Sequence, residues 1–115
     1  MKSERQYFEH ILEELDFIQS QSKSLSKDAF LEDQVLKRAV VRSIEIIGEA
    51  IKKISPEVKN KYVKVEWRKI AGARDHLIHG YFMIDYDIVW DIMINKVPEL
   101  SEQIQEILKN DPLLF

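Results

Sequence analysis

The sequence of 115 residues contains no cysteine, and glycine and proline occur only three times each. Without cysteine, the chain has neither a disulfide framework nor a thiolate metal site. No apolar run reaches the roughly 18 residues that a membrane-spanning helix needs, and the N-terminal segment is amphipathic and acidic, unlike a signal peptide. The content of 45% hydrophobic and 32% charged residues is typical of globular proteins. We therefore expect a single domain, residues 1–115, in the cytoplasm.

Basic side chains are concentrated in one stretch of the chain. Residues 52–74 hold eight basic side chains and two acidic ones, a net charge of +6, so the rest of the chain carries −9 of the total of −3. A basic segment of this kind can guide a polyanion such as RNA. The side chains expected to do so include Lys64, Arg68 and Lys69. The alternative is an ordinary solvated loop and helix face, and charge alone does not decide between the two.

Apolar residues recur every three or four positions, which predicts an all-α fold. A first helix is expected from about Ser3 to Gln21, and a second from about Lys27 to Ile54 with Ser26 as its N-cap. Apolar residues cover more than one face of the second helix, so it needs two partners. One is the bundle itself, and the other could be a second copy of the chain. Small residues around Gly48 would let another helix approach closely.

Three further helices are expected in the second half of the chain. A short one begins at Ser55-Pro56, where serine caps and proline occupies the first turn, and ends near Tyr62. A third main helix begins near Glu66 and is ended by Gly80. Asp85 then caps a last helix, which Pro98 interrupts as a kink or as a fresh first turn.

Residues 74–81, Arg-Asp-His-Leu-Ile-His-Gly-Tyr, combine the side chains needed for phosphodiester chemistry. An arginine can clamp a phosphate through two parallel hydrogen bonds, and a histidine can transfer a proton near neutral pH. Arg74 with His76 or His79 could therefore act without a metal. On a straight helix Arg74 and His79 would lie about 140° apart and would not share a face. A two-fold dimer could instead bring two copies of the segment into one groove.

These side chains also have structural interpretations. Arg74 could pair with a nearby acid, and His79 could cap its helix. Glu45 and Glu49 lie on one face of the second helix, where each could be a solvated acid, a partner of Arg74 or a group that orients a histidine. Arg42 is another potential partner on that helix.

A metal site is a further alternative. His76 and His79 are three residues apart and could share a metal on one face of a helix. His10 is the only other histidine in the chain. Asp75 or Asp85 could complete such a site, but nothing in the sequence fixes their geometry.

The spacing of three residues in the segment 74–81 resembles the R-x4-H-x-Y motif of HepT-type toxins, which belong to the HEPN superfamily of helical ribonucleases. The three residues are Arg74, His79 and Tyr81. Residues 67–74, Trp-Arg-Lys-Ile-Ala-Gly-Ala-Arg, are similar to the family's lead-in to this motif, and Gly-Tyr-Phe at 80–82 with Asp85 and residues 88–90 is similar to its exit. Residues 42–50, Arg-Ser-Ile-Glu-Ile-Ile-Gly-Glu-Ala, resemble its second-helix signature. The combination is far more specific than the short motif alone.

The resemblance implies an up-and-down bundle of four to five helices that forms a two-fold dimer and cleaves RNA in the groove between the protomers, with no metal or other cofactor. Arg74 would hold the scissile phosphate and stabilise the charged transition state. His79 would act as general acid or base. The residues that could support them are Asp75, His76, Glu49 and Arg42.

The resemblance also implies a partner and an off-switch. In a type VII (HepT/MntA) toxin–antitoxin pair, a small MntA-like nucleotidyltransferase transfers AMP to the motif tyrosine, here Tyr81. The added charge and bulk would block RNA entry. Judged from residue type alone, Tyr81 is a packing aromatic. The alternative functions are a non-catalytic helical subunit that binds a nucleotidyltransferase or its nucleotide, and a plain structural or metal-binding bundle.

One position departs from the family pattern. Many HEPN nucleases have asparagine directly after the arginine, whereas this chain has Asp75. A carboxylate there would repel a phosphate unless it pairs with Arg68, Lys69 or a histidine.

Overall fold

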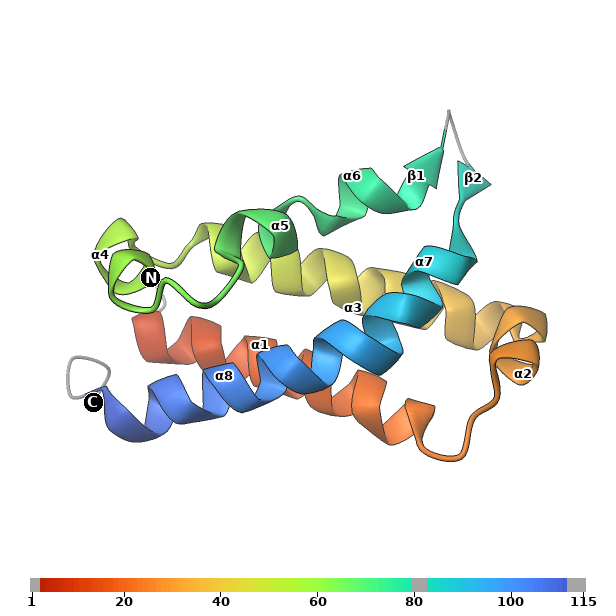
Figure 1. Cartoon of the computed structure of the whole chain (residues 1–115), viewed down its shortest axis with the longest axis horizontal. Helices are drawn as coiled ribbons and strands as arrows, with labels where there is room; N and C mark the ends of the chain where they lie inside the picture. Colours follow the sequence, from red (N-terminus) through yellow and green to blue (C-terminus); the bar gives the residue numbers. More distant parts are fainter. Residues whose placement is uncertain (1–2, 80–82, 112–115) are drawn as a thin grey trace.

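Three long helical stretches form the body of the molecule (Figure 1). The computed structural model describes residues 3–79 and 83–111. The long stretches are α1 (Glu4–Ser22), α3 (Gln34–Lys52) and a continuous run of α7 (Tyr86–Asp91), the π-helix η1 (Ile92–Lys96) and α8 (Val97–Asn110). Helix α1 packs against both α3 and α8. The expected all-α class is confirmed, and no helix among the described residues has the length and hydropathy to cross a bilayer.

Four short helices and one pair of very short strands complete the described structure. They are α2 (Lys27–Glu32), α4 (Pro56–Lys61), α5 (Trp67–Ala71), α6 (Ala73–Leu77), β1 (Ile78–His79) and β2 (Met83–Ile84). Helices α5 and α6 pack along α3, and the strands extend beyond them (Figure 1). This arrangement places the segment of Arg74 on the outer surface of α3.

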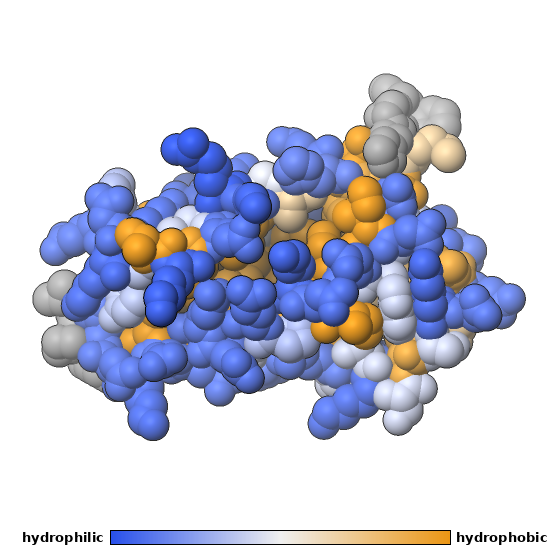
Figure 2. Space-filling model, in the orientation of Figure 1, coloured by the Kyte–Doolittle hydropathy of each residue, from blue (hydrophilic) through white to orange (hydrophobic). Residues whose placement is uncertain are grey.

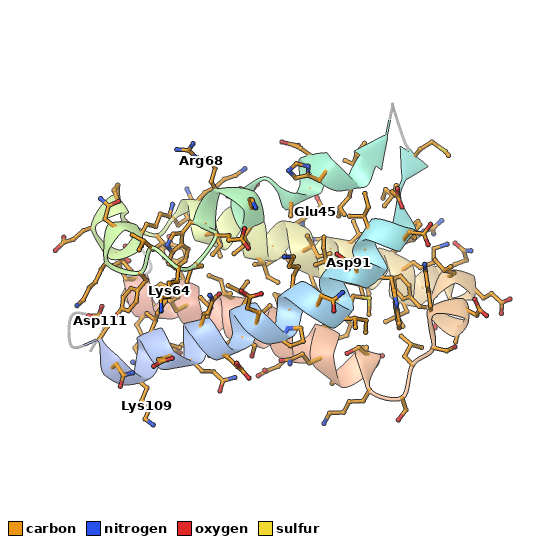
Figure 3. All side chains as sticks on the ribbon, viewed as in Figure 1. Glu45, Lys64, Arg68, Asp91, Lys109 and Asp111 are labelled. Atoms are coloured by element: carbon orange, nitrogen blue, oxygen red, sulfur yellow. The ribbon has the colours of Figure 1, made fainter. Side chains whose placement is uncertain are left out.

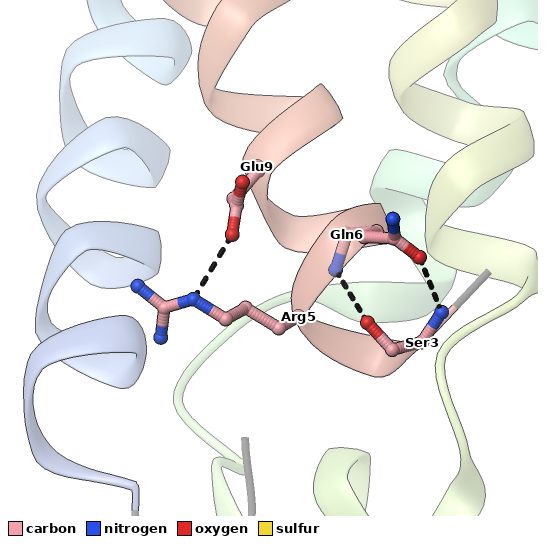
Figure 4. A network of polar contacts seen from close by, with 4 residues as sticks. All are labelled: Ser3, Arg5, Gln6 and Glu9. Atoms are coloured by element: carbon pink, nitrogen blue, oxygen red, sulfur yellow. Dashed lines mark hydrogen bonds and ion pairs between the residues drawn. The ribbon is translucent and has the colours of Figure 1, made fainter. Parts of the chain in front are cut away.

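The helix starts follow the local sequence. Ser3 and Gln6 form a reciprocal capping box at the start of α1, with the Gln6 amide 3.2 Å from the Ser3 hydroxyl (Figure 4). The expected caps Ser26, Ser55 and Asp85 each accept backbone N–H groups of the turn that follows. Such caps satisfy amides that have no partner inside the helix. They are predictable because donor and acceptor are only a few residues apart.

The prediction of a single helix over residues 27–54 is wrong, because the helix is broken at Asp33, which separates α2 from α3. Asp33 has an extended backbone, and its carboxylate accepts the Leu36 amide at 2.9 Å as the N-cap of α3. The break directs Phe30 toward α7, where its ring centroid lies 5.6 Å from that of Trp90 and 6.4 Å from that of Tyr86. Phe30 is fully buried, so this aromatic contact offsets the broken backbone hydrogen bonds.

The third main helix is also shorter than expected and is broken. Gly72 separates α5 from α6, and α6 ends at Leu77 rather than at Gly80, which lies outside the described residues. Ile78 and His79 then pair in an antiparallel manner with Ile84 and Met83. The Asp85 amide donates to the Leu77 carbonyl at 2.8 Å, which closes this hairpin. His79 is therefore not helical, and the angle of 140° expected between Arg74 and His79 does not apply.

Both apolar faces of α3 are covered within the chain, apart from Val35 near its start, which is 81% exposed. One face packs on α1, and the other packs on α5, α6 and α7. The second partner that α3 needs is thus part of the same protomer, so the apolar pattern of α3 no longer argues for a dimer. The close approach expected at Gly48 is confirmed, because a Cβ atom there would lie 3.2 Å from the Ala71 carbonyl oxygen.

Pro98 lies in the first turn of α8, one of its two expected roles, although the helical path from α7 is not interrupted. The Val97 amide donates to the Ile92 carbonyl five residues earlier, and α8 then carries Pro98 in its first turn. Proline has no N–H to donate and crowds the carbonyl four residues before it. The wider π turn of η1 accommodates both effects without ending the helical path.

Candidate functional site

A small polar groove lies between α3 and the α5–α6 segment. Its volume is about 70 Å³. Its charged lining consists of Glu45, Glu49 and Lys52 from α3 and Arg74 and Asp75 from α6. The backbone contact at Gly48 brings the two walls together, because this glycine and Ala71 also line the groove. The arginine predicted to bind phosphate therefore lies in a preformed site that mixes acids and bases.

Arg74 is anchored at one atom and otherwise open to solvent. Its Nε atom lies 3.4 Å from Oε2 of Glu45 on α3. The Arg74 side chain is 61% exposed and that of Glu45 is 26% exposed. A long, single-point ion pair of this kind restrains the guanidinium without enclosing it. The structure thus brings Arg74 together with one of the two acids considered for it.

The other two α3 residues considered as supports form no ion pair with Arg74, although Glu49 lines the same groove. Glu49 pairs with Lys52 at 3.2 Å, one turn along the same helix. Arg42 is exposed, does not line the groove and forms no ion pair within the described ranges. Glu45, rather than Glu49, is therefore the acid opposite Arg74. No local signal selects Glu45 over Glu49, because both acids lie within four residues of Gly48 and the choice depends on where α5–α6 crosses α3.

Asp75 keeps its charge uncompensated beside Arg74. It is exposed and, within residues 3–79 and 83–111, forms no ion pair with Arg68, Lys69 or His76. The nearby ammonium of Lys69 instead contacts Glu66 at 2.7 Å. None of these three residues therefore neutralises the Asp75 carboxylate.

His76 belongs to a different, apolar groove of about 340 Å³. This groove is lined by aliphatic side chains of α1, α3, α5, η1 and α8, with charged residues such as Lys69 and Lys96 among its lining residues. Figure 2 shows it as a hydrophobic hollow between hydrophilic margins. His76 lines this hollow and not the groove of Arg74, so the structure separates these two predicted site residues.

The remaining motif residues are only partly described. His79 has its backbone in β1, five residues after Arg74, and its side chain is outside the description. Tyr81 lies outside the described residues. His76 and His79 do not share a helical face as the metal alternative required, since one is in α6 and the other in β1. No group of three or more metal-ligating side chains occurs in the described part of the chain.

Half of the eight cations of residues 52–74 are paired with acids. The pairs are Lys52–Glu49, Lys61–Asp111, Lys69–Glu66 and Arg74–Glu45. Hydrogen bonding to Glu66 raises the pKa of Lys69, and the reciprocal bond lowers the pKa of Glu66. Lys64 and Arg68 are exposed and carry no ion pair to any described residue (Figure 3). Of the three expected guides, these two have no acid as a described ion-pair partner, whereas Lys69 is paired with Glu66.

The fold and the groove define a small helical protein with a solvent-open arginine held beside acids. Comparison with known proteins then assigns its family. A family model described as "Ribonuclease HepT-like" matches residues 11–107, and the chain belongs to that family. The expected class, a ribonuclease with a HEPN-like helical fold, is confirmed by this membership.

Several relatives match over most of their length. A protein of Caldanaerobacter subterraneus named "Putative RNase" is 48% identical over 111 residues, covering 96% of this chain and 99% of that protein. A protein of Methanocaldococcus jannaschii with the same type of name is 44% identical and covers 95% and 90%. A "Probable ribonuclease HepT" of Thermococcus cleftensis is 33% identical and covers 94% and 98%. No solved structure matches the chain.

Proposed function

We propose that the protein is a metal-independent endoribonuclease toxin that cleaves RNA in a groove between two protomers, with Arg74 and His79 as its catalytic residues. The observation that carries this proposal is Arg74, anchored by Glu45 at Nε and 61% exposed in a preformed groove. The membership in the Ribonuclease HepT-like family supports the substrate class. The whole chain, of which the family model covers residues 11–107, would act as one domain in the cytoplasm.

The proposed chemistry needs only groups of RNA and of this chain. His79 removes the proton of a ribose 2′-hydroxyl, and the 2′-oxygen attacks the adjacent phosphorus. Arg74 binds two phosphate oxygens and stabilises the extra charge of the transition state. The bond from phosphorus to the 5′-oxygen breaks, and that oxygen receives the proton that the imidazole of His79 took from the 2′-hydroxyl. The products are a cyclic 2′,3′-phosphate and a 5′-hydroxyl.

The test is RNA cleavage in the presence of a chelator. Arg74→Ala should lower kcat by about 10²-fold or more because it removes transition-state charge stabilisation. His79→Ala should lower it by about 10²- to 10⁴-fold because it removes proton transfer. The matched controls are Arg38→Ala and His10→Ala, which remove the same side-chain types from exposed positions of α3 and α1. Cleavage at the wild-type rate by both active-site variants would overturn the proposal.

We further propose that an MntA-like nucleotidyltransferase antitoxin inhibits the protein by transferring AMP to Tyr81. The support is the position of Tyr81 in the sequence, two residues after His79. Co-expression with such an enzyme should raise the intact mass by whole AMP units, and Tyr81→Phe should abolish the increase. Tyr86→Phe is the control, because Tyr86 packs on Phe30 beyond the hairpin. An AMP adduct that persists in Tyr81→Phe would contradict this assignment.

A further inference from the structure

We infer that Glu45 is a positioning residue that holds the Nε edge of Arg74 and leaves the two terminal nitrogens of the guanidinium for a phosphate. The inference rests on the proposed function for its catalytic consequence. The contact itself joins Nε of Arg74 to Oε2 of Glu45 at 3.4 Å. The fork of Nη1 and Nη2 is the edge that binds two phosphate oxygens in parallel. One acid can therefore fix the guanidinium while that edge remains open.

Glu45 is suited to this role because its own position is fixed. It lies on the 19-residue helix α3 between the buried residues Ile44 and Ile47, and its side chain is only 26% exposed. Gly48, one turn further, brings the backbone of α5 so close that a Cβ atom there would lie 3.2 Å from the Ala71 carbonyl oxygen. The distance between the two walls of the groove is thus set by backbone packing, and Glu45 projects across it.

The other acids of the groove do not fulfil this role. Glu49 is engaged by Lys52 at 3.2 Å. Asp75 is the neighbour of Arg74 on the short helix α6, so it cannot tie Arg74 to a second element. Glu45 is the acid of this groove that links Arg74 to α3 among the residues that the structure describes.

The expected consequence is a loss of turnover rather than of RNA affinity. Without Glu45, the long Arg74 side chain would sample many orientations, and fewer of them would place its fork on the reacting phosphate. Misplacement of a positioning group by about 1 Å can cost about 10²-fold in rate. Binding of RNA does not require one orientation, and removal of a competing carboxylate favours it.

Nitrogen-15 NMR of the arginine Nε–H groups tests the contact without any activity assay. In the wild type, hydrogen exchange of the Arg74 Nε–H should be slower than in Glu45→Ala by about fivefold or more, because the carboxylate shields it. Glu49→Gln, which alters the acid one turn away, should leave this exchange unchanged. Equal exchange in wild type and Glu45→Ala would overturn the inference, whatever the protein does to RNA.

Kinetics test the catalytic consequence. Glu45→Ala should lower kcat about tenfold with KM unchanged or lower, and it should have no further effect in the Arg74→Ala background. Glu45→Gln should recover most of the loss, because its amide oxygen can still accept from Nε. A rise in KM at constant kcat, or an equal loss in the Arg74→Ala background, would overturn the positioning role. If wild type and Arg74→Ala cleave RNA equally, the proposed function fails. The NMR experiment still decides whether Glu45 holds the Nε–H of Arg74, because it does not depend on activity.

Discussion

Asp75 is the one acid beside Arg74 that no described cation neutralises. Asp75→Asn should therefore tighten RNA binding, because it removes repulsion of the phosphate while keeping the size of the side chain. Two unit charges about 4 Å apart in water interact by about 1 kcal/mol, which corresponds to about a fivefold change in affinity. The gain should shrink as salt increases. Fluorescence anisotropy with labelled RNA, in the His79→Ala background to keep the RNA intact, measures both effects.

Asp16→Asn is the control for net charge. Asp16 is exposed on α1, and its removal changes the total charge by the same amount. An equal gain in affinity from Asp16→Asn and Asp75→Asn would mean that the carboxylate at residue 75 has no local effect on phosphate binding.

The sequence left open which acid would pair with Arg74. Glu45 and Glu49 are four residues apart on one face of α3, so helical geometry leaves both as candidates. The choice depends on where α5–α6 crosses α3, and that crossing is set by the carbonyls of Ile70 and Ala71 packing over Gly48. Such a register is a tertiary property that local patterns do not encode.

At the scale of elements, a partly buried contact joins the end of α4 to the end of α8. The Tyr62 hydroxyl donates to Oδ2 of Asp111 at 2.8 Å, and the Lys61 ammonium lies 3.2 Å from the same oxygen. Asp111 is fully buried. Desolvation of the Tyr62 phenol and its hydrogen bond to Asp111 raise the pKa of Tyr62 from 10 to about 12. Both effects favour the neutral phenol in the folded protein.

The free energy of unfolding should therefore depend on pH through Tyr62. The raised pKa means that the stabilising contribution is complete below about pH 10 and is lost as pH rises to about 12. Tyr62→Phe should lower the free energy of unfolding by about 1–3 kcal/mol at neutral pH, because it leaves a buried carboxylate with one partner fewer. The substitution should also reduce the fall in the free energy of unfolding between about pH 10 and pH 12. Urea unfolding at several pH values measures both, and Tyr7→Phe is the control. A Tyr62→Phe protein as sensitive to alkali as the wild type would contradict this account.

The elements show where local sequence information ends. Caps at Ser26, Ser55 and Asp85 were predicted, because each satisfies amides within three residues. The breaks at Asp33 and Gly72 were not, because the helical periodicity continues through both. Packing of Phe30 on α7 and the approach of α5 to Gly48 favour these breaks, and both contacts join residues far apart in the sequence.

At the scale of the whole molecule, the proposed dimer depends on an exposed surface, since α3 is covered within the chain. The apolar groove between α5–α6 and η1–α8, with a volume of about 340 Å³, offers such a surface (Figure 2). Sedimentation velocity at about 10 µM should give twice the 13.6 kDa of one chain. Ile70→Asp should dissociate the dimer, because the interface would then have to bury an unpaired carboxylate, which is unfavourable. Val35→Asp, at an apolar position 81% exposed on α3, is the control.

Mixing two inactive variants tests whether the dimer forms the site. Arg74→Ala and His79→Ala protomers, unfolded and refolded together, produce heterodimers in which one protomer retains its arginine and the other its histidine. If Arg74 of one protomer acts with His79 of the partner subunit, the mixture should cleave RNA at about a quarter of the wild-type rate, since about half of the dimers are mixed and each restores one of two sites. If each protomer contains its own site, no protomer in the mixture is complete, and cleavage stays at the level of the separate variants. A folded mixture without recovery, as judged by circular dichroism and sedimentation, would exclude the site shared between protomers while leaving the role of each residue intact.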